Sequence, residues 1–483
     1  MCEGFGIIGF IKFLGCYYIN IITQQKKVGC IGSNNIYTIK ANEIIPILPR
    51  DENESNTIQK LWSRISKKIN QTSTDIAESR YMGLFQFVDI TKDFYFSYTY
   101  DLTHSVQFNY IMSLKRLYLP PTPSEMYEWN YHQTAEFKLL YSESSSFNHW
   151  LLPIVHGSYE QRKFNLFGRT LDVALVARRS RHFAGTRYLK RGVSVHGKAA
   201  NDVETEQILQ LDSGKQAKYS SYLQMRASIP TYWHQEASVT TPKPPILINR
   251  VDPSYEATQG HFKDLIVRYG APIIVLDLVK QYEKKPRESI IGKELYFAVM
   301  EINSTMPSDM QIRYCALDHS RITKTKQRVN GISKEANNGI GYAANYASTY
   351  NTGEETEWAV LENSVRAAAA ANTQSPGGDT ARTHSNTIAG AAGNSGNGRI
   401  DILKQLEDIS AMTLSETAIF CTKTRFLADI KEFQPAHAAA ARSRGYLEQR
   451  GVLRTNCIDC LGMFFALAYL HSASHISHIC NTA

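Results

Sequence analysis

The sequence predicts an α/β protein with a β-rich N-terminal subdomain followed by a larger α/β domain. The first forty residues hold short β-branched and aromatic runs separated by Gly and Asn, which is typical of a β-meander. From about residue 150, apolar runs suited to buried strands alternate with stretches of helical periodicity. The chain has 483 residues, 43% of them hydrophobic and 20% charged, so a folded protein with more than one core is expected.

In the N-terminal subdomain, residues 1–150, we predict four short strands, a further hairpin and one helix. Residues 24–27 form a predicted basic turn, residues 82–88 and 93–100 the hairpin, and residues 105–118 the helix, which ends before three prolines. The four strands are Ile7–Phe13, Tyr17–Ile22, Val28–Ile31 and Ile36–Ile39.

The second domain is predicted to begin at residue 151 and to be interrupted. Strands are expected over Thr170–Val176 and Ile273–Val279. Helices are expected over Asn201–Leu211, Tyr255–Arg268 and Phe420–Phe433. We divide this domain into a first part at residues 151–322 and a second part at residues 401–461. Between them, residues 323–400 are rich in Asn, Ala, Ser, Thr and Gly, which predicts a disordered insertion.

Charge and cysteine content limit the classes of function. The net charge of +8 suits an acidic partner, either anionic lipid or nucleic acid, without choosing between them. The eight cysteines are widely scattered, which favours reduced cytosolic thiols over a disulfide framework. No signal peptide and no apolar window of ~18 residues is evident, so any membrane contact is expected to be peripheral.

One short run carries the predicted chemistry. Residues 454–461 read Arg-Thr-Asn-Cys-Ile-Asp-Cys-Leu, directly after Val452-Leu453, which we expect to end a strand. A cysteine in a loop between a strand and a helix can sit in a cradle of backbone N–H groups that binds phosphate. The same field lowers the thiol pKa and yields a thiolate that can attack phosphorus without a metal.

This run resembles the signature of the Sac-type phosphoinositide phosphatases, and four further segments resemble that family. They are residues 178–181 with 184–192 (a basic element), 200–207, 224–230 with Trp233, and 95–103 with the N-terminal strands. The resemblance covers residues 5 to about 300 and 445–461. Residues 242–246, 270–273 and 287–290 look most like the branch that acts on phosphatidylinositol 3,5-bisphosphate.

The resemblance implies a fold, an activity and a set of site residues. The second domain is expected to be a cysteine-phosphatase-like catalytic domain that removes a phosphate, expected to be the 5-phosphate of phosphatidylinositol 3,5-bisphosphate, through a phosphocysteine intermediate. No metal or cofactor is implied, and nucleic acid is not expected as a partner. The implied catalytic residues are Cys457 and Asp459, and the implied substrate-binding residues are Arg454, Asn456, Cys460, Arg187, Lys190 and Arg191.

Several of these residues have a second interpretation from the sequence alone. Asp459 can donate a proton to the leaving inositol oxygen, or it can cap the loop by hydrogen bonding. Arg454 and Asn456 are expected to brace the loop, and Cys460 to pack rather than act as a second nucleophile. The basic element holds six lysines and arginines between Arg178 and Arg191, which either form a solvated face or attract anionic headgroups.

The sequence departs from the family pattern after Leu461. The family places a phosphate-binding arginine six positions after the nucleophile, and here that position is Met463. No arginine or lysine follows Arg454, and residues 462–483 bear no likeness to the family, so we expect a catalytic domain that is incomplete at its C-terminus. We therefore expect impaired activity. The alternative is a catalytically inactive scaffold in an endosomal complex with a lipid kinase and a scaffold protein.

A remote alternative concerns the same cysteines. Cys457 and Cys460, followed by His471 and His475, have the ligand types of a zinc finger, but the central gap is shorter than usual. Because the resemblance already accounts for both cysteines, we expect no zinc site. The predicted location is cytoplasmic, peripheral on an endosomal or vacuolar membrane.

Overall fold

In the computed structural model, the described residues divide between two compact units. The structure describes residues 3–14, 17–47, 76–115, 122–140, 150–166, 169–185, 189–211, 218–236, 244–248, 252–317, 402–422, 444–456 and 458. Unit 1 takes in Met1–Lys163, Asp172–His182 and Val203–Gln210, and unit 2 takes in Phe164–Leu171, Phe183–Asp202 and Leu211–Ala483. The predicted disordered insertion and the segment 462–483 lie outside the described residues, and the predicted domain boundaries stay predictions.

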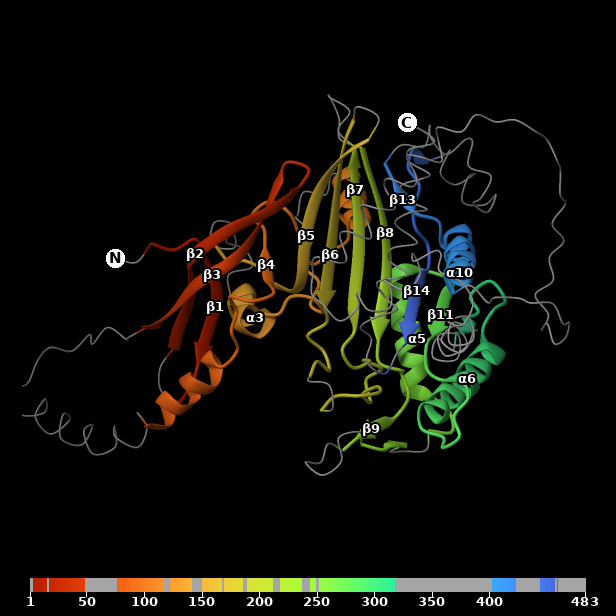
Figure 1. Cartoon of the computed structure of the whole chain (residues 1–483). Coiled ribbons are helices and arrows are strands. Elements are labelled where there is room, and N and C mark those ends of the chain that lie inside the picture. The colour runs from red at the N-terminus through yellow and green to blue at the C-terminus, as the bar shows by residue number, and fades with distance from the viewer. Residues whose placement is uncertain are drawn as a thin grey trace, which may run out of the picture. The chain divides into compact units, whose positions relative to one another are not determined.

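Unit 1 is built on a sheet whose strands follow one another in chain order (Figure 1). β1 to β5 pair antiparallel with their neighbours. Ile22, Ile39, Phe96 and Ile154 lie in the core of this unit and are almost fully buried. The strands are β1 (Gly6–Lys12), β2 (Tyr17–Ile31), β3 (Asn34–Ile47), β4 (Phe94–Phe96), β5 (Val155–Leu166), β6 (Arg169–Arg179) and β7 (Val203–Leu211).

The predicted basic turn at residues 24–27 is wrong, because β2 runs through it. Irregularities in the pairing of β2 with β3 near Gln24 and Gly29 let the long, partly polar strand continue. The chain instead turns at Gly32, whose φ is +62°, a left-handed conformation that glycine adopts without strain. The predicted strands are therefore confirmed in place, but two of them are parts of one longer strand.

The predicted hairpin at residues 82–100 is only half right. β4 is a strand as expected, but residues 76–86 are helical. Tyr81 and Phe85 both face Phe13, with ring centroids 6.3 and 6.2 Å away, so the apolar contacts recur every four residues and not every two. The helix predicted over residues 105–118 is confirmed as α2 (Val106–Leu114), and α3 (Tyr131–Leu140) follows it.

Unit 2 contains a parallel sheet in the order β8-β14-β11-β12 (Figure 1). These strands are β8 (Lys218–Ala227), β14 (Val452–Asn456), β11 (Ile273–Asp277) and β12 (Arg313–Ala316). The short strand β13 (Phe420–Cys421) pairs antiparallel with β8, and β9 (Trp233–Gln235) pairs with β10 (Ile246–Ile248) apart from the sheet. The helices are α5 (Glu256–Tyr269), α6 (Glu288–Thr305) and α10 (Ile402–Thr417).

Helices cover both faces of this parallel sheet, which explains why its central strand β11 is apolar up to its last residue. Ile273 and Val275 pack with buried residues of α5 and α6. Ile274 and Leu276 belong to a second cluster, with Leu453 and residues of α10. The alternation along β11 thus sends successive side chains to opposite layers, and the predicted α/β class is confirmed.

Two predicted helices are strands in the structure. Most of the predicted helix at residues 201–211 is the strand β7, Val203–Leu211, and Phe420–Cys421 form β13; residues 423–433 of that second prediction lie outside the described residues. β7 is buried along most of its length, which removes the alternation that usually marks a strand. Glu204 and Glu206 occupy the same face of β7, as positions two apart on a strand do, and both bind Arg178. The predicted helix at residues 255–268 is confirmed as α5.

Candidate active site

β14 leads directly into the predicted nucleophile. It lies between β8 and β11, parallel to both, and ends at Asn456, the residue before Cys457 in sequence. The carboxyl ends of parallel strands form the edge at which α/β proteins bind ligands. Cys457 and Asp459, like Cys460, Met463 and Arg187, lie outside the described residues, so their roles stay predictions. What the structure describes is the framework that holds the start of the loop.

Arg454 is buried in the layer between β14 and α5. Its side chain is on the same face of the strand as Val452, which packs in the α5 and α6 core, and its exposed fraction is 0%. Its Nε donates to Nε2 of His261 at 2.9 Å, and its Nη2 donates to the carbonyl oxygen of Ser228 at 2.8 Å. These contacts hold the strand before the loop; the predicted roles of Arg454 in bracing the loop and in binding substrate stay predictions.

His261, on α5, is held as a neutral imidazole between two partners. Its Nδ1 lies 3.1 Å from the carbonyl oxygen of Gly197, which can only accept, so the ring proton is on Nδ1. The bare Nε2 then accepts from Arg454. Burial lowers the pKa of His261 well below its ordinary value, and the positive charge of Arg454 lowers it further.

Ser228 connects β14 with the segment that follows the basic element. Besides accepting from Arg454 through its carbonyl, it accepts from the backbone N of Gly192 through Oγ at 3.0 Å. Its own N–H donates to Ala200 at 3.0 Å. Gly192 has a φ of +71°, and a Cβ there would lie 2.4 Å from the carbonyl oxygen of Thr231, so this approach needs glycine.

Two of the predicted substrate-binding residues of the basic element, Lys190 and Arg191, are described, and the structure places them differently. Arg191 donates from Nη1 to the carbonyl oxygen of Ile458, and its guanidinium carbon lies 5.4 Å from the ring of Trp233. It therefore contacts the backbone next to Cys457. Lys190 is exposed and lies over the ring of Phe183 at 5.0 Å. The fold thus brings a residue of the basic element to the signature loop, across 267 positions of sequence.

Arg178, at the start of the same charge run, has a different place. It is fully buried in unit 1, where it donates to Glu204 at 2.6 Å and also to Glu206. Its remaining donors bind the carbonyl oxygens of Leu102 and His104. Arg178 therefore belongs to a structural ion cluster, and for this residue the interpretation as a solvated or lipid-facing surface is wrong.

Asn456 and Asp277 end neighbouring strands as register partners. Both are fully buried, and among the described residues neither amide atom of Asn456 has a hydrogen-bond partner. The Asp277 carboxylate accepts from the hydroxyl of Tyr314 at 2.6 Å. Burial raises the pKa of Asp277 to about 6, although the hydrogen bond from Tyr314 and the charge of Arg454 oppose this shift. A buried carboxyl group therefore lies beside the entry to the loop.

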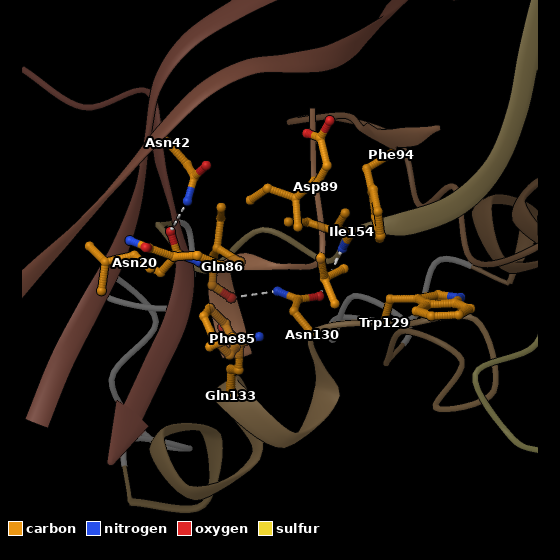
Figure 2. Close-up of a pocket in the computed structure, with 14 residues that line it drawn as sticks. Asn20, Asn42, Phe85, Gln86, Asp89, Phe94, Trp129, Asn130, Gln133 and Ile154 are labelled. Carbon is orange, nitrogen blue, oxygen red and sulfur yellow. Dashed lines mark hydrogen bonds between the residues drawn. The ribbon is translucent and has the colours of Figure 1, made fainter. Parts of the chain in front are cut away.

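A pocket of about 470 Å³ lies in unit 1, between the helix at residues 76–86 and the sheet (Figure 2). Its polar lining includes Asn20, Asn42, Asn130 and Gln133, and apolar side chains such as Phe94 also line it. Asn42 donates to Asn20 at 2.9 Å, and Asn130 donates to two backbone carbonyls, so the amides stabilise the walls. None of the described residues predicted for the active site lines this pocket.

Comparison with known proteins decides the family. Residues 5–324 match the SacI homology domain, about two thirds of the chain. The chain belongs to the SacI homology domain family. The expected resemblance to Sac-type phosphoinositide phosphatases is thereby confirmed, and the α/β structure agrees with it.

Named Sac-family relatives are phosphoinositide phosphatases. The chain is 36% identical over 469 residues to "Phosphatidylinositol-3-phosphatase SAC1" of Arabidopsis thaliana, a match that covers 95% of this chain and 45% of that protein. It is 34% identical over 334 residues to "Polyphosphoinositide phosphatase" of Schizosaccharomyces pombe, covering 67% and 37%. It is 40% identical over 321 residues to "Phosphoinositide phosphatase SAC5" of Arabidopsis thaliana, covering 66% and 38%. The chain thus spans less than half the length of these relatives.

Sequence reasoning missed three residues of this framework. Ser228 lay inside a segment noted for its resemblance, but His261 and Asp277 carried no signal of their own. His261 lay in a correctly predicted helix, and its partner Arg454 is 193 positions away. Asp277 ended a correctly predicted strand, and an aspartate at the carboxyl end of a parallel strand is the signal that could have singled it out.

Proposed function

We propose that this chain carries the chemistry of a phosphoinositide phosphatase, with Cys457 as the nucleophile. The observation that carries the proposal is the position of β14, which ends with Asn456 at the carboxyl edge of a parallel sheet, one residue before Cys457 in the sequence of a Sac-family chain. The contact from Arg191 to Ile458 supports it, because a basic residue from a remote segment holds the backbone next to the nucleophile.

The proposed reaction has two steps. The Cys457 thiolate attacks phosphorus, an S–P bond forms, and the bond from phosphorus to the inositol oxygen breaks with its electron pair on that oxygen. The leaving oxygen takes a proton from Asp459. Water then attacks the phosphocysteine and gives a proton to the Asp459 carboxylate, and the S–P bond breaks with its electron pair on sulfur. Inorganic phosphate leaves, and the thiolate and the protonated Asp459 are restored. The scheme uses no metal or cofactor.

The described residues supply the setting for this chemistry. Arg454 and Arg191 hold the backbone on either side of Cys457, and preorganised backbone donors stabilise charge at no cost of rearrangement during the reaction. Asn456 has a buried amide with no described partner at the loop entry, which suits a residue that orders the loop when substrate is present. Exposed Lys190 is the described residue best placed to meet an anionic headgroup.

Met463 limits the expected rate. Removal of one donor that acts mainly in the transition state costs about 2.7–4 kcal/mol, or roughly a hundred- to a thousandfold in rate. The family position of the phosphate-binding arginine is Met463 here, so we propose that hydrolysis by this chain is slow.

The proposed substrate is the 5-phosphate of phosphatidylinositol 3,5-bisphosphate. Segments such as residues 242–246 favour this branch, and the name of the fission yeast relative is compatible with it. The Arabidopsis relative is named a 3-phosphatase, so the position of the phosphate is the finer point to test. Membrane contact would be peripheral, on an endosomal or vacuolar surface; among the described residues no helix is long and apolar enough to cross a membrane.

A second candidate function is a catalytically inactive scaffold in a complex with a lipid kinase and a scaffold protein. The loss of the arginine at Met463 favours it, and the described contacts that hold β14, from Arg454 to His261 and Ser228, come from other parts of the chain. In this case the chain would bind its partners and leave the phosphate untouched.

Phosphate release from short-chain phosphoinositides separates these functions. The chain, Met463→Arg and Cys457→Ser are each incubated with the 3-phosphate, the 4-phosphate and the 3,5-bisphosphate of phosphatidylinositol. We expect slow release by the chain, release at least a hundredfold faster by Met463→Arg, and none by Cys457→Ser. Release that survives Cys457→Ser would overturn the cysteine mechanism, and no release from any variant would support the scaffold.

A further inference from the structure

His261 occupies a junction between three segments that meet around the start of the signature loop. It lies on α5. Its Nδ1 contacts the carbonyl oxygen of Gly197, five residues beyond the end of the basic element, and its Nε2 contacts Arg454 on β14. It is 1% exposed, and a Cβ at Gly197 would lie 2.9 Å from the backbone N of His261, so the two backbones are in close contact. Neither ring nitrogen can change partner without moving one of these segments.

The network around His261 forms a closed path from the basic element to β14. Gly192 donates to the hydroxyl of Ser228, and the carbonyl of Ser228 accepts from Arg454. Arg454 donates to His261, and His261 donates to Gly197, five residues beyond Gly192. The path therefore begins and ends in the segment that also holds Arg191 against Ile458.

Ion pairs also connect residues 198–202 with α5. Lys198 lies 3.1 Å from Asp264, and Arg268 lies 3.0 Å from Asp264 and 3.8 Å from Asp202. The Lys198–Asp264 pair is partly exposed and contributes little by itself, whereas Asp202 is buried. Arg454 itself is held by two buried hydrogen bonds, one to His261 and one to the carbonyl oxygen of Ser228.

We propose that His261 is a positioning residue that acts through Arg454 to fix the signature loop for attack on phosphate. This inference rests on the proposed function for its chemical meaning. The alignment itself does not depend on that function. The neutral imidazole donates to Gly197 on one side and accepts from Arg454 on the other, and so aligns residues 192–197 with β14. A substitution that keeps only the contact with Arg454 is therefore expected to differ in its effect from one that keeps only the contact with Gly197.

Two conservative substitutions separate the two sides of the ring. His261→Gln places an amide oxygen near the position of Nε2, where it can accept from Arg454. His261→Asn places an amide near Nδ1, where it can donate to Gly197, but it does not reach Arg454. We expect His261→Gln to keep the signature loop as ordered as in the wild type and His261→Asn to make it more mobile. His196→Asn is the matched control, because His196 is exposed and adjoins Gly197.

Hydrogen–deuterium exchange in the full chain measures loop position without any need for activity. We expect the peptide spanning residues 452–461 to exchange roughly tenfold faster in His261→Asn, and at the wild-type rate in His261→Gln and His196→Asn. Thermal unfolding checks that each variant is folded. The proposal would be overturned if this peptide exchanged at the same rate in His261→Asn and His261→Gln, whether both rates equal the wild-type rate or both exceed it. If His261→Asn does not fold, His261→Gln still decides it, because exchange faster than wild type in Gln contradicts the role assigned to Nε2.

A second readout relates the position of the loop to its chemistry. The rate of iodoacetamide reaction at the Cys457 peptide is followed against pH by mass spectrometry. We expect the midpoint to rise by about one pH unit in His261→Asn and to stay in His261→Gln. A wild-type midpoint near the ordinary cysteine value would count against the proposed thiolate chemistry, while the exchange comparison would still decide the role of His261.

Discussion

Nε of Arg454 lies 2.9 Å from Nε2 of His261, and both side chains are buried between β14 and α5. A guanidinium bound to a neutral imidazole leaves one positive charge in the interior. The carboxyl group of Asp277, one strand away on β11, is the buried acidic group that senses this charge, since Arg454 lowers its pKa against the larger effect of burial. Arg454 on β14, the strand that precedes Cys457, and His261 and Asp277 on neighbouring elements are thus three buried polar residues close to the loop.

The pKa of Asp277 predicts how its replacement changes stability with pH. Burial raises this pKa from 3.8 to about 6, so the folded protein prefers the protonated form. Ionisation of Asp277 therefore destabilises the fold above pH 6, and the penalty is relieved as pH falls from 6 towards 4. The full difference corresponds to about 3 kcal/mol.

Asp277→Asn removes this penalty while it keeps an oxygen for Tyr314. We expect the free energy of unfolding of Asp277→Asn, relative to wild type, to increase by about 2–3 kcal/mol between pH 4 and pH 7.5. Urea denaturation at both pH values measures it. Asp309→Asn, at an exposed position, should show no such trend, and a difference that does not vary with pH would contradict the assigned environment of Asp277.

Arg178 predicts a large loss of stability in unit 1. Arg178→Met leaves Glu204 and Glu206 buried without their cation, which typically costs about 3–5 kcal/mol. Lys163→Met is the control, because Lys163 is largely exposed and lies 3.8 Å from Asp172, and we expect its effect to be below about 1 kcal/mol. Denaturation midpoints compare the two. A triple change of Arg178→Met, Glu204→Gln and Glu206→Gln should recover part of the loss.

Gly451, the residue before β14, has a backbone conformation and a close backbone contact that require glycine. Its φ is +85°, and a Cβ there would lie 2.2 Å from the carbonyl oxygen of Pro272. We expect Gly451→Ala to destabilise the protein by more than about 1 kcal/mol. Gly83, in the helix at residues 76–86, has open space around it, and Gly83→Ala should stabilise by about 0.5–1 kcal/mol. Thermal unfolding of the two variants should therefore shift in opposite directions.

Lys190 and Arg191 predict different kinetic effects although they are adjacent. Exposed Lys190 would contact the headgroup in the ground state and the transition state alike, so Lys190→Met should raise KM several-fold and leave kcat unchanged. Arg191 holds Ile458, so Arg191→Met should lower kcat about tenfold or more with a smaller change in KM. Steady-state kinetics in the Met463→Arg background measures both. The same change in KM and kcat for the two variants would show that they do not have separate roles.

The sequence predicted the parts of the fold in which local pattern and tertiary burial agree. β11 is a short run, apolar up to its last residue, that is buried throughout, and the buried residues of α5 recur at helical spacing. β7 was predicted as a helix, and in the structure it is a strand buried along most of its length, so its sequence lacks the alternation of a half-buried strand. The strand period survives only in Glu204 and Glu206, whose shared partner Arg178 is 26 and 28 positions away. No local pattern reports such a pairing.

The candidate site divides in the same way. The signature run and the basic element are contiguous motifs, so they could be identified from the sequence. His261 could not, because its role depends on a donor in β14 and an acceptor at Gly197, both distant in the chain. Arg191 was assigned to the substrate by resemblance, and the structure gives it a contact with the backbone of Ile458. The roles of Cys457 and Asp459 stay predictions.

Detection of the phosphorylated enzyme tests the central claim most directly. The chain and Met463→Arg are mixed with phosphatidylinositol 3,5-bisphosphate, quenched in acid within the first turnover, digested and analysed by mass spectrometry. We predict a phosphate on the Cys457 peptide in both proteins, with more in Met463→Arg, and none in Cys457→Ser. Phosphate released while Cys457 stays unmodified, or phosphate found on another residue, would contradict the account.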